Sequence, residues 1–199
     1  VFAVYMMTGF IYNDKTQTFT TLPLLSGLAP PVGYSIIHPN ECPQNLNCFH
    51  DLKEGLAYAK QVNKPVFLDF TGYACVNCRK MEEHVWPDKE VYKLLSEKYV
   101  VVSLYVDDKA ELPAKEQVTL YYKNGAPKPL KSVGDKWNYF QTFHFNNNSQ
   151  PLYALIAADG TLLNSPVGYT PDPRQYEEFL KCGLDAFQQT QKTLIGSAE

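Results

Sequence analysis

The sequence predicts an α/β fold, in which a central mixed β-sheet is flanked by helices. Two short runs of β-forming apolar residues, at 65–71 and 100–106, are separated by helix-like segments, as in a β-α-β crossover. Later in the chain an Asp159-Gly160 turn joins two strand-like runs, and a helix-like segment follows at 172–191. A parallel crossover combined with an antiparallel hairpin gives a mixed sheet with helices on both faces.

An N-terminal extension, residues 1–49, precedes this regular pattern. We expect residues 1–12 to form a strand, because the stretch "FIYNDKTQTFT" (10–20) has a turn-forming NDK between two β-prone runs and so predicts a hairpin. The alternative is that residues 1–12 are the end of a membrane helix, because twelve residues are too few to span a bilayer alone. Residues 20–48 are rich in Pro, Gly and Asn, which predicts an irregular arm.

From His50 onward each element follows from hydrophobic spacing and from its flanking residues. We expect a domain at 50–191 with an insert at about 108–149, and a tail at 192–199. The expected elements, in order, are a helix at 50–64 capped by Asp51, the strand at 65–71, helices at 75–85 and 89–99, the strand at 100–106, a strand with an Asn-Gly turn within 118–134, an aromatic helix at 135–145, the hairpin at 150–168 and the helix at 172–191.

The composition is that of an ordinary soluble globular protein. Apolar residues make up 45% of the chain, charged residues make up 20%, and the net charge is −3. No basic run is present, so we expect neither nucleic acid nor an anionic membrane surface as a partner. A chain of 199 residues needs neither metal nor disulfides to fold, so its cysteines are free to serve a function. We expect no cofactor.

The segment "TGYACVNCRKMEEH" (71–84) carries the main functional signal, a CxxC pair where a strand gives way to a helix. Unpaired backbone N–H groups and the positive end of a helix dipole stabilise a thiolate at that place. We expect Cys75 to be exposed as the first helical residue and Cys78, one turn later, to be shielded. One thiolate can then attack while its neighbour resolves the mixed disulfide. Arg79 and Lys80 either add positive potential or are simply solvated.

Two carboxyl groups are candidates for proton transfer. Asp69 interrupts an apolar strand and shares a face with Phe67 and Thr71. Burial beneath the cysteines would raise its pKa and let it exchange a proton with Cys78. The alternative is an Asp that only accepts a hydrogen bond from a nearby backbone or hydroxyl group. Glu82 lies four residues after Cys78 and either tunes the same proton or belongs to a solvated helix surface.

Two other interpretations of the cysteine pair are weaker. Inert buried thiols belong inside an apolar periodic segment rather than at the start of a helix. A zinc site would need two further ligands, and the spacing in "CPQNLNC" exceeds the usual two to about four intervening residues. The available ligands would be Cys42, Cys48, His50 and Cys182.

With these residues in view, the stretch from His50 to about Gln188 resembles the thioredoxin superfamily. It is most similar to the C-terminal periplasmic domain of bacterial transmembrane thiol:disulfide interchange proteins of the DsbD type. "KPVFLDFTGYACVNCRKMEEHVW" is similar to that family's strand–CxxC–helix segment, including the Asp before the first Cys and the Glu after the second. "NNNSQPLYALIAADG" is similar to the segment in which a proline opens the strand beside the cysteines.

The resemblance implies a thioredoxin-like fold and an electron relay. It implies a cis Gln150–Pro151 bond, where the alternative is an ordinary trans proline at a strand start. We assign these two residues and Tyr73 to holding an incoming polypeptide against Cys75. A membrane-embedded domain would reduce the cysteine pair, which would then reduce a periplasmic domain or other protein disulfides. Residues 1–49 would tether a monomeric domain to the periplasmic side of the inner membrane.

The remaining cysteines and one aromatic cluster have several possible roles. Cys42 and Cys48 flank a short loop and form a structural disulfide, stay reduced, or act as an auxiliary redox pair. Cys182 is expected to be buried in the last helix, and the odd number of cysteines leaves one thiol unpaired. One cluster is either a docking patch or a local core: Trp137, Tyr139, Phe140, Phe143 and Phe145.

The sequence therefore predicts a thiol–disulfide oxidoreductase domain working as a protein-disulfide reductase. In this hypothesis Cys75 attacks, Cys78 resolves, and Asp69 with Glu82 manages the proton. One alternative is a non-catalytic binding module whose CxxC is only a structural disulfide. Another is a free-standing secreted thiol reductase or metal-delivery protein.

Overall fold

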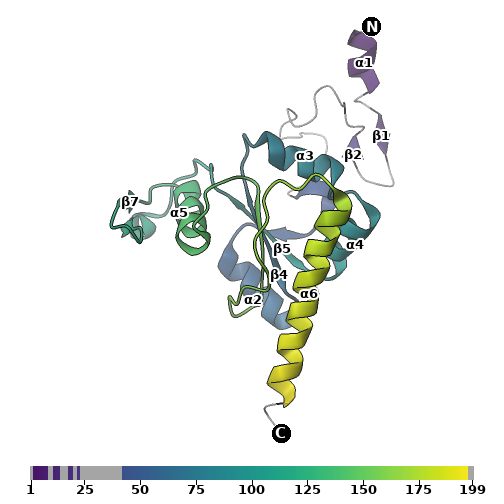
Figure 1. The fold of residues 1–199 in the computed structure, drawn as a ribbon. Coiled ribbons are helices and arrows are strands. Elements are labelled where there is room, and N and C mark those ends of the chain that lie inside the picture. The colour runs from purple at the N-terminus through teal and green to yellow at the C-terminus, as the bar shows by residue number, and fades with distance from the viewer. Residues whose placement is uncertain (1, 9–10, 14–17, 20–21, 23–41, 197–199) are drawn as a thin grey trace.

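The computed structural model describes residues 2–8, 11–13, 18–19, 22 and 42–196 (Figure 1). Its centre is a four-stranded sheet in the order β3-β5-β4-β8. Strands β3, β5 and β4 are parallel to one another, and β8 is antiparallel to β4. This mixed sheet with its flanking helices confirms the predicted fold class. The strands are β3 (Cys48–Phe49), β4 (Val66–Thr71), β5 (Val100–Tyr105) and β8 (Leu152–Ile156).

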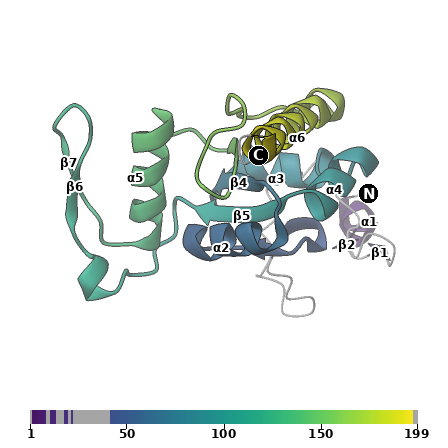
Figure 2. The ribbon, with the colours of Figure 1, turned by 90° about the horizontal axis from the view of Figure 1, so that it is seen from below.

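Helices cover both faces of the sheet (Figure 2). Because side chains alternate along a strand, Leu68 and Phe70 enter one apolar core while Phe67 enters the other. The core around Leu68 is closed by α2 (Leu52–Val62) and α5 (Val133–Phe145). The core around Phe67 is closed by α3 (Val76–His84), α4 (Lys89–Glu97) and α6 (Pro173–Gly196).

Local sequence signals set the ends of these helices. The Asp51 carboxylate accepts hydrogen bonds from the backbone N–H groups of Lys53 and Glu54, which confirms the predicted N-cap of α2. Ser132 and Asp135 form a capping box at the start of α5. The strand pair β6 (Thr119–Tyr121) and β7 (Pro127–Pro129) turns through Gly125, whose φ of +81° suits glycine.

The aromatic residues of α5 form a local core, which is the second of the two predicted alternatives. Trp137 is buried, and Phe140 and Phe145 pack against Phe70 of the central sheet. Tyr139 instead faces the β6–β7 hairpin, where its hydroxyl donates to the carbonyl oxygen of Tyr121. The cluster therefore joins the hairpin to the sheet.

Two sequence predictions are wrong in detail. Residues Phe2–Thr8 form a short helix, α1, rather than a strand, while β1 (Tyr12–Asn13) and β2 (Thr18–Phe19) do pair as a hairpin. After the Asp159-Gly160 turn no second strand forms. The chain makes only two isolated bridges, Leu162 with Ile156 and Val167 with Tyr153, and these are not in one register, so no continuous ladder joins them.

Other predictions on the N-terminal extension lie outside the described residues. They concern Asp14 and Lys15 of the predicted turn, and most of the expected irregular arm, at 23–41. Within the described part of the chain, no helix combines the length and apolar character needed to cross a bilayer.

Candidate active site

The cysteine pair follows the carboxyl end of β4, where a tight loop leads into α3. Asp107, just beyond β5, accepts hydrogen bonds from the backbone N–H groups of Tyr73 and Ala74, at 2.9 and 3.0 Å. Gly72 lies against the same carboxylate, and a Cβ there would stand 3.0 Å from Asp107 Oδ2. A side chain at this position would push the carboxylate from the loop that it holds.

Cys75 is the N-cap of α3 rather than its first helical residue, which corrects the sequence prediction by one position. Its Sγ accepts a hydrogen bond from the backbone N–H of Cys78 at 3.1 Å, as the hydroxyl of an N-cap serine would. A thiolate at Cys75 would gain from this donor and from the helix dipole. The N-cap position therefore suits an ionised sulfur better than the first turn does.

The two cysteines differ in exposure as the mechanism requires. They are joined by a disulfide with their Cα atoms 5.3 Å apart. Cys75 is half-buried, while Cys78 is only 1% exposed. An incoming sulfur therefore reaches Cys75 first, and Cys78 is sheltered beneath it.

A shallow pocket of about 320 Å³ opens beside Cys75. Gln150, which was predicted to contact substrate, lies on its wall, and the Gln150–Pro151 peptide bond is cis, in agreement with the resemblance. Tyr73 stacks its ring on Tyr105 at a centroid distance of 4.2 Å and is 37% exposed, outside the pocket lining. The lining residues are Ala74, Cys75, Val76, Asn77, Asp107 and Gln150.

Asp69 lies buried in the sheet, on the face that α3 covers. It is 1% exposed, and burial raises the pKa of its carboxyl to about 7, against the opposing effects of a Ser103 hydrogen bond and the Arg79 charge. Ser103 Oγ donates to Asp69 Oδ2 at 3.1 Å, whereas Oδ1 accepts no hydrogen bond from any described residue. Both sequence-based expectations for the Asp69 environment are therefore met. The carboxyl accepts a hydrogen bond from a hydroxyl group, and its pKa is raised by burial.

Arg79 and Glu82 form a buried ion pair inside α3. Arg79 Nη2 lies 2.7 Å from Glu82 Oε1 and also donates to Thr71 Oγ1 at 3.2 Å. Neither residue is solvated, since Arg79 is 3% and Glu82 is 6% exposed. Burial raises the pKa of Glu82 well above its usual range, although the Arg79 charge opposes that effect and the Asp69 carboxylate adds to it.

Ser103 and Asp107 were not recognised from the sequence as site residues, and Arg79 was considered for its charge but not for a buried ion pair with Glu82. Arg79 follows Cys75 by four residues and precedes Glu82 by three, so helical spacing could have placed all three on one face. Ser103 and Asp107 carried no such signal, because they meet Asp69 and the loop only through the register of β4 on β5.

The other three cysteines lie apart from this pair. Cys42 and Cys48 form a second disulfide, with Cα atoms 6.0 Å apart. Cys182 is exposed and free, which corrects its predicted burial; Leu180 and Gly183 face the core instead. Among described residues, the one cluster of three close ligand atoms is Cys42, Cys48 and His50, so no third ligand joins the CxxC pair and the zinc interpretation of that pair has no support.

Comparison with known proteins agrees with this fold. A family model described as a thioredoxin-like domain matches residues 52–183. The chain belongs to this family. No curated protein matches the chain significantly.

Solved structures of thioredoxin-fold proteins are also similar. The structure described as DsbH oxidoreductase has 21% identity and a TM-score of 0.51 over 70% of this chain and 85% of its own. A thioredoxin from Thermus thermophilus has 17% identity and a TM-score of 0.47 over 67% of this chain and 84% of its own. At such identities the first likeness concerns the fold alone.

Family membership and the cysteine geometry together support a thiol–disulfide oxidoreductase. The disulfide at the start of α3 has one half-buried and one buried sulfur, and a buried carboxyl with a pKa of about 7 lies in the strand before it. Two cysteines of unequal exposure and a titratable carboxyl are the kinds of group that disulfide exchange uses.

Proposed function

We propose that this domain is a protein-disulfide reductase that cycles between the Cys75–Cys78 disulfide and its dithiol. The observation that carries the proposal is the difference in exposure within one helix-capping disulfide. A purely structural disulfide has no need of a half-exposed sulfur at a helix N-terminus beside an open pocket. The same geometry argues against a non-catalytic binding module.

In the proposed reaction, the Cys75 thiolate attacks one sulfur of a protein disulfide and forms a mixed disulfide. The other substrate sulfur leaves as a thiolate and takes a proton from water. Cys78 then loses its proton, attacks Cys75 Sγ and releases the second substrate thiolate. The second thiolate also takes a proton from water, so the substrate gains two electrons and two protons, while the domain keeps the Cys78 proton on an acceptor group and is left as the Cys75–Cys78 disulfide.

Asp69 is the proposed acceptor of the Cys78 proton. A carboxyl whose pKa is about 7 is partly ionised near neutral pH, so it can take a proton in one step and give it back in the reverse step. Glu82 and Arg79 act through Asp69, because the Arg79 charge lowers the pKa of Asp69 and pairs with Glu82. We class both as positioning residues.

The electron source and the substrates follow from the sequence resemblance. We propose that a membrane-embedded donor reduces the pair, as in the DsbD type, and that periplasmic protein disulfides accept the electrons. In this arrangement residues 1–49 tether a monomeric domain to the inner membrane. Gln150, on the wall of the pocket beside Cys75, would contact the bound polypeptide together with Tyr73 and Pro151.

Trapping of a reaction intermediate tests the exchange mechanism. The Cys78→Ser variant keeps the attacking thiol but cannot resolve, so it should accumulate a mixed disulfide with a reducible substrate protein such as insulin. Non-reducing gels and mass spectrometry would detect the adduct on Cys75. Cys182→Ser in the same background is the control, because it removes the exposed free thiol. An adduct that disappears with Cys182, or none at all, would refute the assigned roles.

A further inference from the structure

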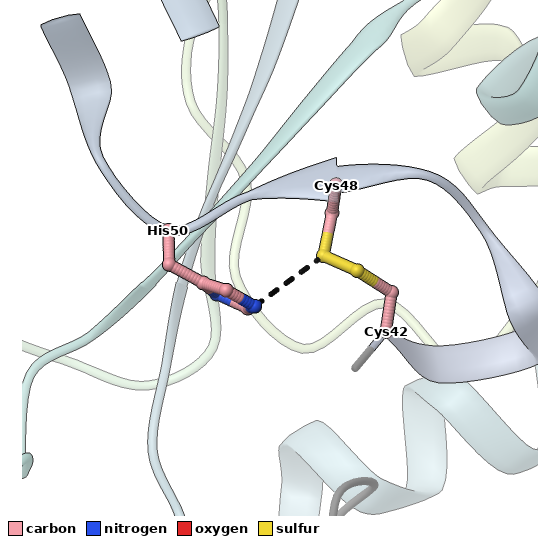
Figure 3. A group of neighbouring side chains, drawn as sticks. All are labelled: Cys42, Cys48 and His50. Atoms are coloured by element: carbon pink, nitrogen blue, oxygen red, sulfur yellow. Dashed lines mark hydrogen bonds between the residues drawn. A yellow bond between two sulfur atoms is a disulfide. The ribbon is translucent and has the colours of Figure 1, made fainter. Parts of the chain in front are cut away.

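A second group of sulfur and nitrogen ligands lies at the edge strand β3 and involves neither Cys75 nor Cys78 (Figure 3). Cys42, Cys48 and His50 each place one ligand atom within 4.8 Å of the others. The His50 ring points at the disulfide, with Nε2 at 3.8 Å from Cys48 Sγ. Thiolate and imidazole are the ligands that zinc prefers in proteins.

The hydrogen bond of the His50 ring determines which of its two nitrogens can bind a metal ion. Nδ1 lies 3.2 Å from the carbonyl oxygen of Ser103. A carbonyl can only accept, so this bond requires the hydrogen on Nδ1. In the neutral ring Nε2 then carries a lone pair, and it is the nitrogen that faces Cys48. Metal-binding histidines are oriented in this way, with the second ring N–H donated to a backbone carbonyl or a carboxylate.

In the oxidised chain the two sulfurs are bonded to each other and are neutral, so neither is a thiolate ligand. We propose that reduction of Cys42–Cys48 converts this group into a zinc site with two thiolates and one imidazole. A dithiol reductant transfers two electrons to the disulfide, becomes a disulfide itself, and leaves two cysteine thiols. Zinc then binds both sulfurs and His50 Nε2 and displaces the two thiol protons. Three protein ligands leave a fourth position for water or another small ligand.

The surroundings allow both steps. Cys42 is buried and Cys48 is half-buried, but both line a pocket of about 600 Å³ through which a reductant can approach. His50 is exposed, so its side of the site is open to solvent. The loop between the cysteines is held by Gln44, whose side-chain Nε2 donates to the backbone oxygen of Glu82 at 2.8 Å. This anchor keeps the loop in place after the disulfide opens.

Zinc titration of a chain with only these two thiols tests the proposal. The background variant carries Cys75→Ser, Cys78→Ser and Cys182→Ser, which leaves two of the five cysteines. After reduction and anaerobic removal of the dithiol, calorimetry should show one zinc ion bound per chain, and the oxidised chain should bind none. His50→Ala should weaken binding at least about tenfold, the lower end of the effect of losing a ligand-orienting contact.

The matched control is His84→Ala, which removes an exposed histidine outside the cluster and should leave the zinc affinity unchanged. A second comparison needs no change at the active site, because the reduced wild-type chain should bind one zinc ion more than Cys42→Ser/Cys48→Ser does. The proposal is wrong if oxidised and reduced chains bind zinc equally, if neither binds it, or if His50→Ala binds as tightly as its parent.

The reduction potential gives a further measurement. Zinc binds the reduced form of the pair and not the disulfide, so it stabilises the reduced form. The reduction potential of Cys42–Cys48 should therefore become more positive as zinc is added. Zinc at about a hundred times its dissociation constant shifts the equilibrium about a hundredfold, or roughly 60 mV for a two-electron couple. A potential that does not move with zinc would contradict the site.

Discussion

The two disulfides of this chain are similar as covalent links but differ in what surrounds them. Cys75–Cys78 spans three positions and Cys42–Cys48 spans six, so chain entropy gives each about 2 kcal/mol of stabilisation. The first caps a helix, with Asp69, Arg79 and Glu82 buried along the strand and helix that it joins. The second lies beside the edge strand β3, with a histidine against one sulfur.

This difference shows that the setting, rather than the bond, determines the chemistry of a disulfide. A helix N-terminus stabilises a thiolate, and a buried carboxyl with a pKa of about 7 can take up a proton. An edge strand offers neither, but it offers an imidazole whose Nδ1 is held by a backbone carbonyl. The first pair is therefore suited to exchange with protein disulfides, and the second to a metal ion once reduced.

The largest expected effect is on disulfide-reductase activity, which should depend on Cys75–Cys78 and not on Cys42–Cys48. Cys75→Ser should abolish the reduction of insulin disulfides, because the attacking sulfur is gone. Cys42→Ser/Cys48→Ser should retain the parent rate when the same dithiol donor is supplied. The measurement is turbidity of reduced insulin under matched folded concentrations. A lower rate in the double variant would show that Cys42–Cys48 also takes part in disulfide exchange, so that the two pairs would not differ in function.

Asp69→Asn should slow the resolving step by about a hundredfold, the lower range for a general base, because an amide cannot accept the Cys78 proton. The mixed disulfide is formed first, and the release of substrate from it is then monitored by rapid quench at pH values between 5 and 9. This measures the resolving step directly. The wild-type rate should rise through a pH of about 7, the pKa of Asp69, and the variant should lose that rise. An unchanged profile would exclude Asp69 as the acceptor.

Asp69→Asn should also change how the free energy of unfolding depends on pH. An Asp whose folded pKa is raised stays protonated in the folded chain while it ionises in the unfolded chain, so stability falls as pH rises from about 4 to about 7. Asp69→Asn removes that fall. The stability of the variant relative to wild type should therefore grow by about 4 kcal/mol between pH 4 and pH 8, at 1.36 kcal/mol for each pKa unit. Urea unfolding measures it, with the exposed Asp185→Asn as the control.

The smallest expected effect concerns the second disulfide as a crosslink. Cys42→Ser/Cys48→Ser should lower the free energy of unfolding by about 2 kcal/mol in the absence of reductant, since the unfolded chain loses its closed loop. Denaturant titration measures the change, and Cys182→Ser should stay within about 0.5 kcal/mol of wild type because its thiol is exposed and unpaired. A double variant as stable as wild type would mean that the disulfide contributes no net crosslinking.

Much of the site was visible in the linear sequence. The CxxC between a buried strand and a helix predicted the cysteine pair, and period-2 alternation placed Asp69 on the face that α3 covers. The Asp51 cap, the order of the strands and helices, and the Asp159-Gly160 turn were predicted from local signals. These features depend on residues that are neighbours in the chain or within one turn of a helix.

Other features could not be predicted from local signals. Cys182 was expected to be buried, but which side of α6 faces the core depends on how that helix packs on β8 and α4. The second strand of the predicted hairpin does not form, because the chain takes five residues from Leu162 to Val167 while β8 takes three from Ile156 to Tyr153, and the register is lost between the two bridges. For Arg79 the sequence left open an added positive potential or a solvated side chain, and only the packed structure shows that it is buried and paired with Glu82.

The sequence alone determined the order of the elements from α2 to β8, the cysteine pair and the carboxyl in the strand before it, because each depends on short-range periodicity and on residue type. Only the tertiary structure decided that Ser103 meets Asp69, that Asp107 holds the loop, and that His50 faces Cys48. These contacts join residues on different strands and loops. Their register is set by packing of the whole sheet, which no local stretch of sequence encodes.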